Sequence, residues 1–222
     1  MDARRYLAVA RDIADDSGDP TLQAQALAVS AHPGMPWNSM DGRIDDPRRI
    51  SRFLSGALGR ARGADGPTRA WLHRWMAVIV AANGDEHSFR FHMETADHAL
   101  DEAAAVKPVS FLPHWAATEG RETGATEGMG LRLLGRADDA DAALSRALAA
   151  AAPDWLGWRA MLLVDTAAVR VLQNAPEETC ASLLTALDLA RKAGYRVAVS
   201  RAHSVRSTSP ALGTRVLRRR AR

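Results

Sequence analysis

Apolar residues recur at intervals of three and four along most of the chain, which is the spacing of one face of an α-helix. In residues 3–16 this spacing continues until Gly18 and Pro20 end it. Similar patterns, bounded by Gly, Pro, Asn and Asp, predict ten helices. They cover residues 3–16, 21–31, 47–62, 68–82, 86–106, 113–134, 136–152, 155–173, 177–192 and 195–208.

Composition supports an all-α fold. Alanine, the residue with the highest helix propensity, supplies 44 of the 222 residues. Aromatic residues, which strands favour, make up 5% of the chain. The loops between the predicted helices are short, so consecutive helices are expected to form antiparallel hairpins.

Three of the predicted hairpins repeat one spacing of small residues. A small residue in the first helix precedes an alanine in the second by 19 positions, in the pairs Ala77/Ala96, Gly128/Ala147 and Ala167/Ala186. A turn residue follows the first small residue by seven positions, at Gly84, Gly135 and Asn174, and a large residue precedes the second by three, at Met93, Leu144 and Leu183. This spacing is typical of the tetratricopeptide unit. The alternative is a chance match between alanine-rich hairpins. We therefore expect a tetratricopeptide-like α-solenoid of five antiparallel helical hairpins over residues 1–208, with a basic C-terminal tail over residues 209–222.

Three sequence segments resemble the C-terminal tetratricopeptide region of XRE-type helix-turn-helix transcriptional regulators of high-GC bacteria. They are residues 6–19 (YLAVARDIADDSGD), 133–148 (LLGRADDADAALSRAL) and 158–194 (WRAMLLVDTAAVRVLQNAPEETCASLLTALDLARKAG). The resemblance implies a sensor or interaction region. We find no helix-turn-helix signature in residues 1–60, so DNA is expected as a partner only indirectly, through a missing or separate helix-turn-helix domain.

In tetratricopeptide proteins, the first helices of the hairpins line a concave groove that binds peptides. The repeat register places six partner-binding candidates there, namely Trp71, Arg74, Val78, Glu122, Met129 and Arg132. Core packing is the alternative for Trp71 and Trp75, because large aromatic residues one helical turn apart usually face a core.

No residue pattern indicates catalysis, a cofactor or a metal site. His87, His92 and His98 are five and six residues apart, which puts them on different faces of a helix, and we expect them at the surface. Cys180 is expected to pack as a small apolar side chain. Gly120, Gly124 and Gly128 would share one helix face and allow close helix approach. We therefore predict that the chain is not an enzyme.

Charge is divided unevenly along the chain. Residues 189–222 hold ten basic residues and no acidic one, whereas residues 1–188 carry 19 basic and 26 acidic residues. No apolar run is long enough to span a membrane and the first twenty residues do not form a signal peptide, so we expect a cytoplasmic protein.

The predicted function is a non-catalytic protein- or peptide-binding regulatory module. Two alternatives remain. The first is a self-associating structural repeat protein, with a homodimer as its expected form. The second is weak, non-specific nucleic-acid binding through the arginine-rich tail.

Overall fold

The computed structural model describes residues 3–31, 35, 44, 46–103 and 121–208, and within them it is helical with no strand. These ranges hold ten α-helices and one short 3₁₀ helix, η2 (Ala61–Gly63). The α-helices are α1 (Ala3–Ser17), α2 (Pro20–Val29), α3 (Pro47–Arg60), α4 (Gly66–Ala82), α5 (Glu86–Ala103), α7 (Arg121–Leu133), α8 (Ala137–Ala150), α9 (Leu156–Leu172), α10 (Pro176–Lys192) and α11 (Arg196–Thr208). The all-α prediction is confirmed. The expected helix of residues 113–134 is described only from Arg121, and the basic tail lies outside the described residues.

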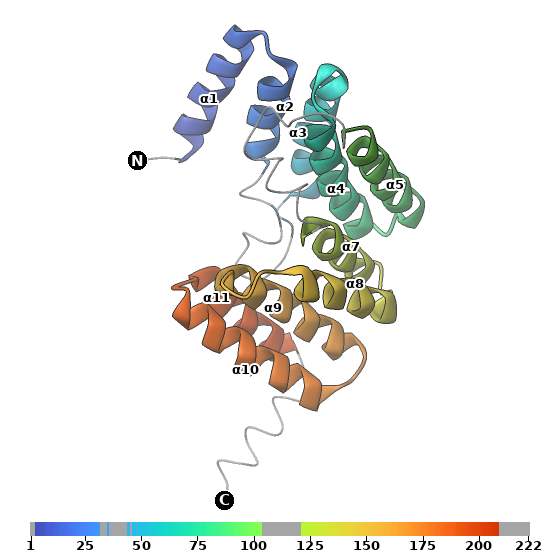
Figure 1. Ribbon diagram of the computed structural model, residues 1–222, viewed down its shortest axis with the longest axis vertical. Coiled ribbons are helices and arrows are strands. Elements are labelled where there is room, and N and C mark those ends of the chain that lie inside the picture. Colours follow the sequence, from blue (N-terminus) through green and yellow to red (C-terminus); the bar gives the residue numbers. More distant parts are fainter. Residues whose placement is uncertain (1–2, 32–34, 36–43, 45, 104–120, 209–222) are drawn as a thin grey trace, which may run out of the picture.

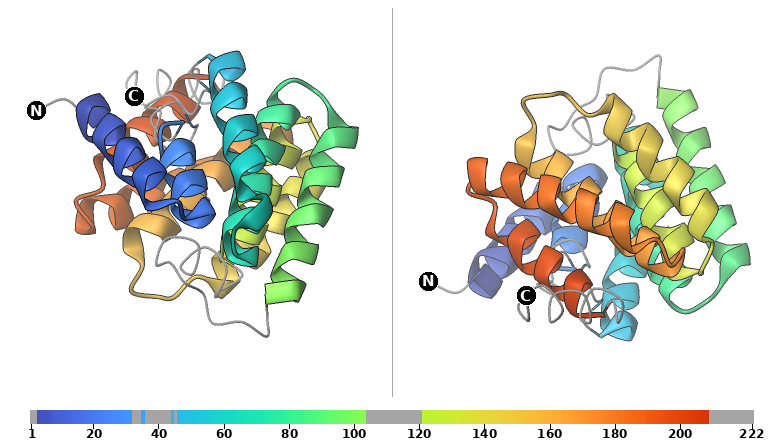
Figure 2. Two further views of the ribbon diagram at one scale, coloured as in Figure 1. Left: turned by 90° about the horizontal axis from the view of Figure 1, so that it is seen from above. Right: turned by 90° about the horizontal axis from the view of Figure 1, so that it is seen from below.

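The helices follow one another down the long axis of the molecule, from α1 at one end to α10 and α11 at the other (Figure 1). Each packs mainly against its neighbours in sequence, and α4/α5, α7/α8 and α9/α10 form the three closest pairs. In views along the long axis, the two helices of each pair lie side by side (Figure 2). None of the described helices combines the length and the apolar character that crossing a membrane requires.

Aspartate side chains begin three of the N-terminal helices. Asp19 and Asp46 accept backbone hydrogen bonds from the first turns of α2 and α3, and Asp65 accepts one from Thr68 N at 2.8 Å in α4. Each carboxylate satisfies a helix N–H that has no partner within the helix.

The three hairpin turns share one backbone conformation. Gly84, Gly135 and Asn174 have φ angles of 77°, 76° and 55°. In each case the N–H of the next residue donates to the carbonyl oxygen five positions before it, such as Arg136 N to Leu131 O at 2.8 Å. This bond closes the helix C-terminus in a left-handed cap. The predicted turn positions are confirmed, and Gly194 repeats the arrangement with φ 65° before α11.

The small residues of the first helices pack against large side chains of the second helices. A Cβ atom built on Gly128 would lie 2.6 Å from Leu144 Cγ, and one on Gly124 would lie 3.1 Å from Ala147 Cβ. Gly128 therefore faces Leu144, 16 positions later, and Ala147 of α8 faces Gly124, one turn earlier in α7. The same offset joins Ala77 to Met93 and Ala167 to Leu183, each pair within one buried cluster.

Candidate functional site

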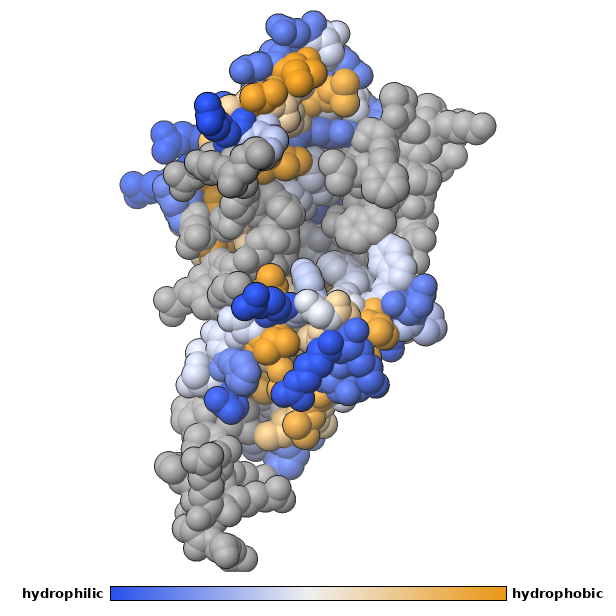
Figure 3. All heavy atoms as spheres, turned by 90° about the vertical axis from the view of Figure 1, so that its left-hand side faces the viewer, coloured by the Kyte–Doolittle hydropathy of each residue, from blue (hydrophilic) through white to orange (hydrophobic). Residues whose placement is uncertain are grey.

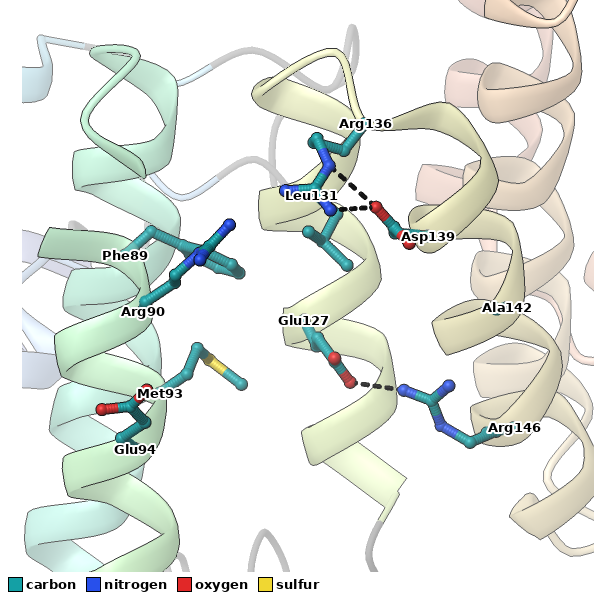
Figure 4. A pocket seen from close by; sticks show the side chains of 10 residues that line it. All are labelled: Phe89, Arg90, Met93, Glu94, Glu127, Leu131, Arg136, Asp139, Ala142 and Arg146. Atoms are coloured by element: carbon teal, nitrogen blue, oxygen red, sulfur yellow. Dashed lines mark hydrogen bonds and ion pairs between the residues drawn. The ribbon is translucent and has the colours of Figure 1, made fainter. Parts of the chain in front are cut away.

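A cleft of about 350 Å³ lies between neighbouring hairpins, where α5 faces α7 and α8 (Figure 4). Its lining combines apolar residues with six charged ones. The residues are Phe89, Arg90, Met93 and Glu94 of α5, Glu127 and Leu131 of α7, Arg136 of the following turn, and Asp139, Ala142 and Arg146 of α8.

The inner part of the cleft is apolar. Phe89 and Met93 point from α5 toward α7 (Figure 4), and both are buried, with 4% and 9% of their surface exposed. They pack with Leu131 in one cluster. Gly130 makes this possible, because a Cβ atom there would lie 2.3 Å from the Phe89 ring. The lack of a side chain at Gly130 therefore positions the aromatic ring at the junction of α5 and α7.

Ion pairs between different elements organise the rim of the cleft. Arg136 Nη1 lies 2.6 Å from Glu86 Oε1 of α5, and Arg136 Nε donates to Asp139 Oδ2 of α8 at 2.8 Å. Glu86 also pairs with Arg90. The turn of one hairpin is thus tied to the first turn of α5 in the preceding hairpin.

A second bridge crosses the lower part of the rim. Arg146 Nη2 donates to Glu127 Oε2 at 2.7 Å, and this pair joins α8 to α7 (Figure 4). The Arg146 side chain is 61% exposed and that of Glu127 32% exposed. Both groups therefore remain accessible to a bound molecule.

The contacts between Glu86, Arg90, Arg136 and Asp139 favour the charged forms of Glu86 and Arg136. The pKa of Glu86 is lowered, first by its hydrogen bond with Arg90 and then by the positive charges of Arg90 and Arg136. The pKa of Arg136 is raised, mainly by its hydrogen bond with Asp139. The cleft consequently presents fixed positive and negative groups around an apolar floor at neutral pH.

Four of the six sequence-predicted partner residues are buried. Trp71, Arg74, Val78 and Met129 expose 5%, 1%, 0% and 5% of their surfaces. The expected exposure on a groove is therefore not found for these four. Trp71, Arg74 and Val78 lie on α4, which is covered by α3, α5 and α7, and Met129 lies on α7, which packs against α4 and α8. The rings of Trp71 and Trp75 contact each other with centroids 4.4 Å apart and planes tilted by 57°, and both residues are buried, as core packing predicts.

Arg74 crosses from α4 to α5 in this buried layer. Its Nη2 lies 3.3 Å from Asp97 Oδ1, while its Nε is buried without a hydrogen-bond partner. The Asp97 side chain is 58% exposed, so the pair extends from the core to the surface. Arg74 therefore ties α4 to α5 and offers little of its own surface to a ligand.

Arg132 lies near the C-terminus of α7, where the charges of Asp165 in α9 and Arg201 in α11 affect its pKa. It is half-buried, and burial lowers its pKa, with the charge of Asp165 opposing and that of Arg201 reinforcing the shift. Asp165 and Arg201 are each 3% exposed and form an ion pair at 2.6 Å. Glu122 belongs to α7, but its side chain lies outside the described residues. Peptide contact by the six predicted residues stays a prediction.

One of the three predicted surface histidines and the cysteine also differ from expectation. His92 is half-buried, and its Nδ1 lies 2.9 Å from His73 Nδ1 across the α4/α5 pair. His87 and His98 are exposed, as predicted. Cys180 is exposed on α10 and so does not pack in the core. Within the described ranges, no group of three or more His, Cys, Asp or Glu residues is arranged to hold a metal ion.

Sequence reasoning did not identify the cleft, although two local signals were present. Glu86 and Arg90 are spaced i,i+4, and Arg136 and Asp139 are spaced i,i+3, which are the spacings of helical ion pairs. Neither spacing indicates that Glu86 and Arg136, 50 positions apart, meet between two hairpins.

Comparison with protein-family models, curated proteins and solved structures finds no match for this chain. The resemblance to XRE-type regulators therefore stays a prediction that rests on the three sequence segments quoted above.

Proposed function

We propose that this protein is a non-catalytic protein- or peptide-binding module, built on a tetratricopeptide-like stack of hairpins, and that the cleft between α5, α7 and α8 is its binding site. The observation that carries the proposal is the combination of an apolar floor, formed by Phe89, Met93 and Leu131, with a rim of fixed charges of both signs. The repeated small-to-large packing and the repeated left-handed turn support the solenoid.

The lining indicates the chemistry of the partner. A volume of about 350 Å³ lies at the lower end of ligand pockets, which suits a few side chains rather than a whole domain. Apolar anchors would occupy the floor, and flanking acidic and basic groups would meet Arg146 and Glu127. An amphipathic peptide segment with one or two apolar anchors fits this description.

The position of the cleft also supports a regulatory role. A peptide in it would touch α5 of one hairpin and α8 of the next, whose relative position depends on the contact between Glu86 and Arg136. Occupancy would favour one spacing of the two hairpins over others, because a ligand shifts a population in proportion to its differential affinity. This coupling is how the module would report binding, consistent with a sensor region.

Panning a random 12-residue peptide library displayed on phage tests the proposal. Recovered peptides would be titrated by fluorescence anisotropy against the wild type and the Ala142→Arg variant, whose new side chain would fill the cleft from the exposed face of α8. We expect at least about tenfold weaker binding, since an apolar contact is replaced by a charged obstruction.

Ala149→Arg is the matched control, because it places the same side chain at an exposed position of α8 that does not line the cleft. It should change affinity less than about twofold. Peptides that bind Ala142→Arg as tightly as the wild type would remove the cleft as the binding site.

A further inference from the structure

Helix α1 exposes an apolar stripe. Tyr6, Val9 and Ile13 expose 58%, 54% and 65% of their surfaces, and the exposed Ala10 lies between them. Spacings of three and four residues put all four on one face of the helix. Apolar residues are visible at the α1 end of the molecule in the space-filling view (Figure 3). With α1 packed on α2, more than half of the surface of Tyr6, Val9 and Ile13 stays exposed.

Charges run along one side of the stripe in a defined order. Arg5 lies near the start of α1, and Asp12 and Asp16 lie near its end. Helical periodicity places these three residues within about 40° of one another around the helix axis, beside the apolar face. All three are exposed, and within the described part of the chain none of them forms an ion pair. Asp15 is separate, since it approaches Arg60 at 3.9 Å.

We propose that α1 is a self-association surface that binds α1 of a second copy of this chain in an antiparallel arrangement. An antiparallel pair centred near Val9 and Ala10 would set Tyr6 against Ile13 of the partner subunit, so the two apolar stripes cover each other. The same side of each helix meets in such a pair, which brings Arg5 close to the partner's Asp12 and the partner's Asp16. A twofold axis then produces each contact twice.

The charge order favours this occupant over an unrelated partner. A basic start and an acidic end oppose the helix dipole, so the order costs stability in an isolated α1. An antiparallel copy supplies an acidic group beside each basic one and reverses that disadvantage. The charged side of α1 is therefore complementary to the same side of a second, antiparallel α1.

The contact is small. One helix from each subunit buries less area than the roughly 800 Å² per partner of a standard stable interface. The dimer is consequently expected to be weak, with dissociation in the micromolar range or above. Its formation does not involve the cleft, so loss of the dimer would leave peptide binding intact.

Sedimentation velocity over about 5–500 μM tests the apolar part of the contact. The wild type should shift from monomer to dimer, and Val9→Glu and Ile13→Glu should each weaken association at least about tenfold. Leu184→Glu is the control, because Leu184 is 69% exposed on α10, and it should associate as the wild type does. A wild type that remains monomeric throughout this range would overturn the proposal.

Complementary charge variants test the antiparallel order. Arg5→Glu gives one variant an acidic flank, and the double variant Asp12→Arg/Asp16→Arg gives another a basic flank. Each alone should lose the dimer, and an equimolar mixture should form a heterodimer of about wild-type affinity. A mixture that stays monomeric, while circular dichroism shows both variants folded, would contradict the pairing.

Cysteine cross-linking locates the axis. In a Cys180→Ser background, which removes the exposed native thiol, Ala10→Cys should oxidise to a covalent dimer. Ile13→Cys in the same background should cross-link far less, since an antiparallel pair separates the two copies of that position. Equal cross-linking at both positions would indicate a parallel pair and overturn the antiparallel assignment.

Discussion

Gly128 of α7 lies against the side chain of Leu144 of α8, so closely that a Cβ atom on Gly128 would be 2.6 Å from Leu144 Cγ. The corresponding positions of the other two hairpins hold Ala77 with Met93 and Ala167 with Leu183. A small residue in the first helix thus receives a large side chain of the second in each hairpin. This pairing sets how closely the two helices approach.

Gly128→Ala should destabilise the protein, because the added methyl group collides with Leu144. We expect a loss of about 1–3 kcal/mol in the free energy of unfolding, measured by urea denaturation. This sign is opposite to the gain of up to about 1 kcal/mol that alanine brings to an unobstructed helix.

Gly59→Ala provides the control for that comparison. Gly59 lies in α3, and nothing would lie within 4 Å of an added Cβ atom. The substitution should therefore stabilise the protein by up to about 1 kcal/mol. Destabilisation by both substitutions would mean that contact with Leu144 does not explain the effect at Gly128.

The turn residues allow a second prediction. Gly135→Ala should cost about 1 kcal/mol, because its φ of 76° lies in the left-handed region that a Cβ atom disfavours. Asn174→Gly should be neutral or stabilising, since Asn174 holds the same conformation with φ 55°. Thermal unfolding monitored by circular dichroism measures both. A loss of stability in Asn174→Gly would show that the asparagine side chain contributes more than its backbone.

The buried ion pair of Asp165 and Arg201 leads to a third prediction. Arg201→Met leaves a carboxylate buried without this partner, at an expected cost of about 3–5 kcal/mol. The double variant Asp165→Leu/Arg201→Met should lose less than Arg201→Met alone, since it leaves neither charge buried. Lys192→Met is the control, because Lys192 and Asp188 form an exposed pair, and it should cost no more than about 0.5 kcal/mol. Equal losses in the single and double variants would contradict this explanation.

Acidic pH should weaken the α4/α5 hairpin through His73. Burial, followed by the charges of His92 and Arg69, lowers the pKa of His73 to about 4, against 6.5 in an unfolded chain. Burial also lowers the pKa of His92, although the charge of Asp85 opposes the shift. The unfolded state therefore binds more protons between pH 6.5 and 4. The contribution of neutral His73 to the free energy of unfolding is therefore complete above pH 6.5 and is lost as the pH falls toward 4.

Urea denaturation at pH 7 and pH 4.5 measures this dependence. His73→Gln should reduce the stability difference between the two pH values by about 1–2 kcal/mol, which allows for the solvent contact that the half-buried ring retains. His98→Gln, at an exposed histidine of α5, should leave the difference unchanged. An unchanged difference in His73→Gln would remove this residue as the cause.

The sequence predicted the helices well because their signals are local. Gly84, Gly135 and Asn174 mark the turns, since each occupies a conformation that few residues adopt. The contact of Gly128 with Leu144 was not predicted. A constant offset to Ala147 identifies equivalent residues in different repeats, but the crossing of two antiparallel helices decides which residues touch.

The binding surface was harder to predict for the same reason. Trp71 and Val78 were assigned to a groove from the repeat register, yet packing of α3, α5 and α7 on α4 buries both. The cleft depends on Gly130 admitting the Phe89 ring and on Glu86 reaching Arg136. These are contacts between hairpins, and no periodicity within one helix encodes them.

Methyl NMR spectroscopy of the peptide complex tests the central claim most directly. Titration of a selected peptide should shift the methyl signals of Met93 and Leu131, which line the cleft, and leave the exposed Leu184 methyl signals of α10 unchanged. The same peptide should produce no shift at Met93 in the Ala142→Arg variant. Shifts confined to residues outside the cleft, or equal shifts at Met93 in the wild type and the variant, would contradict the assignment of the cleft as the binding site.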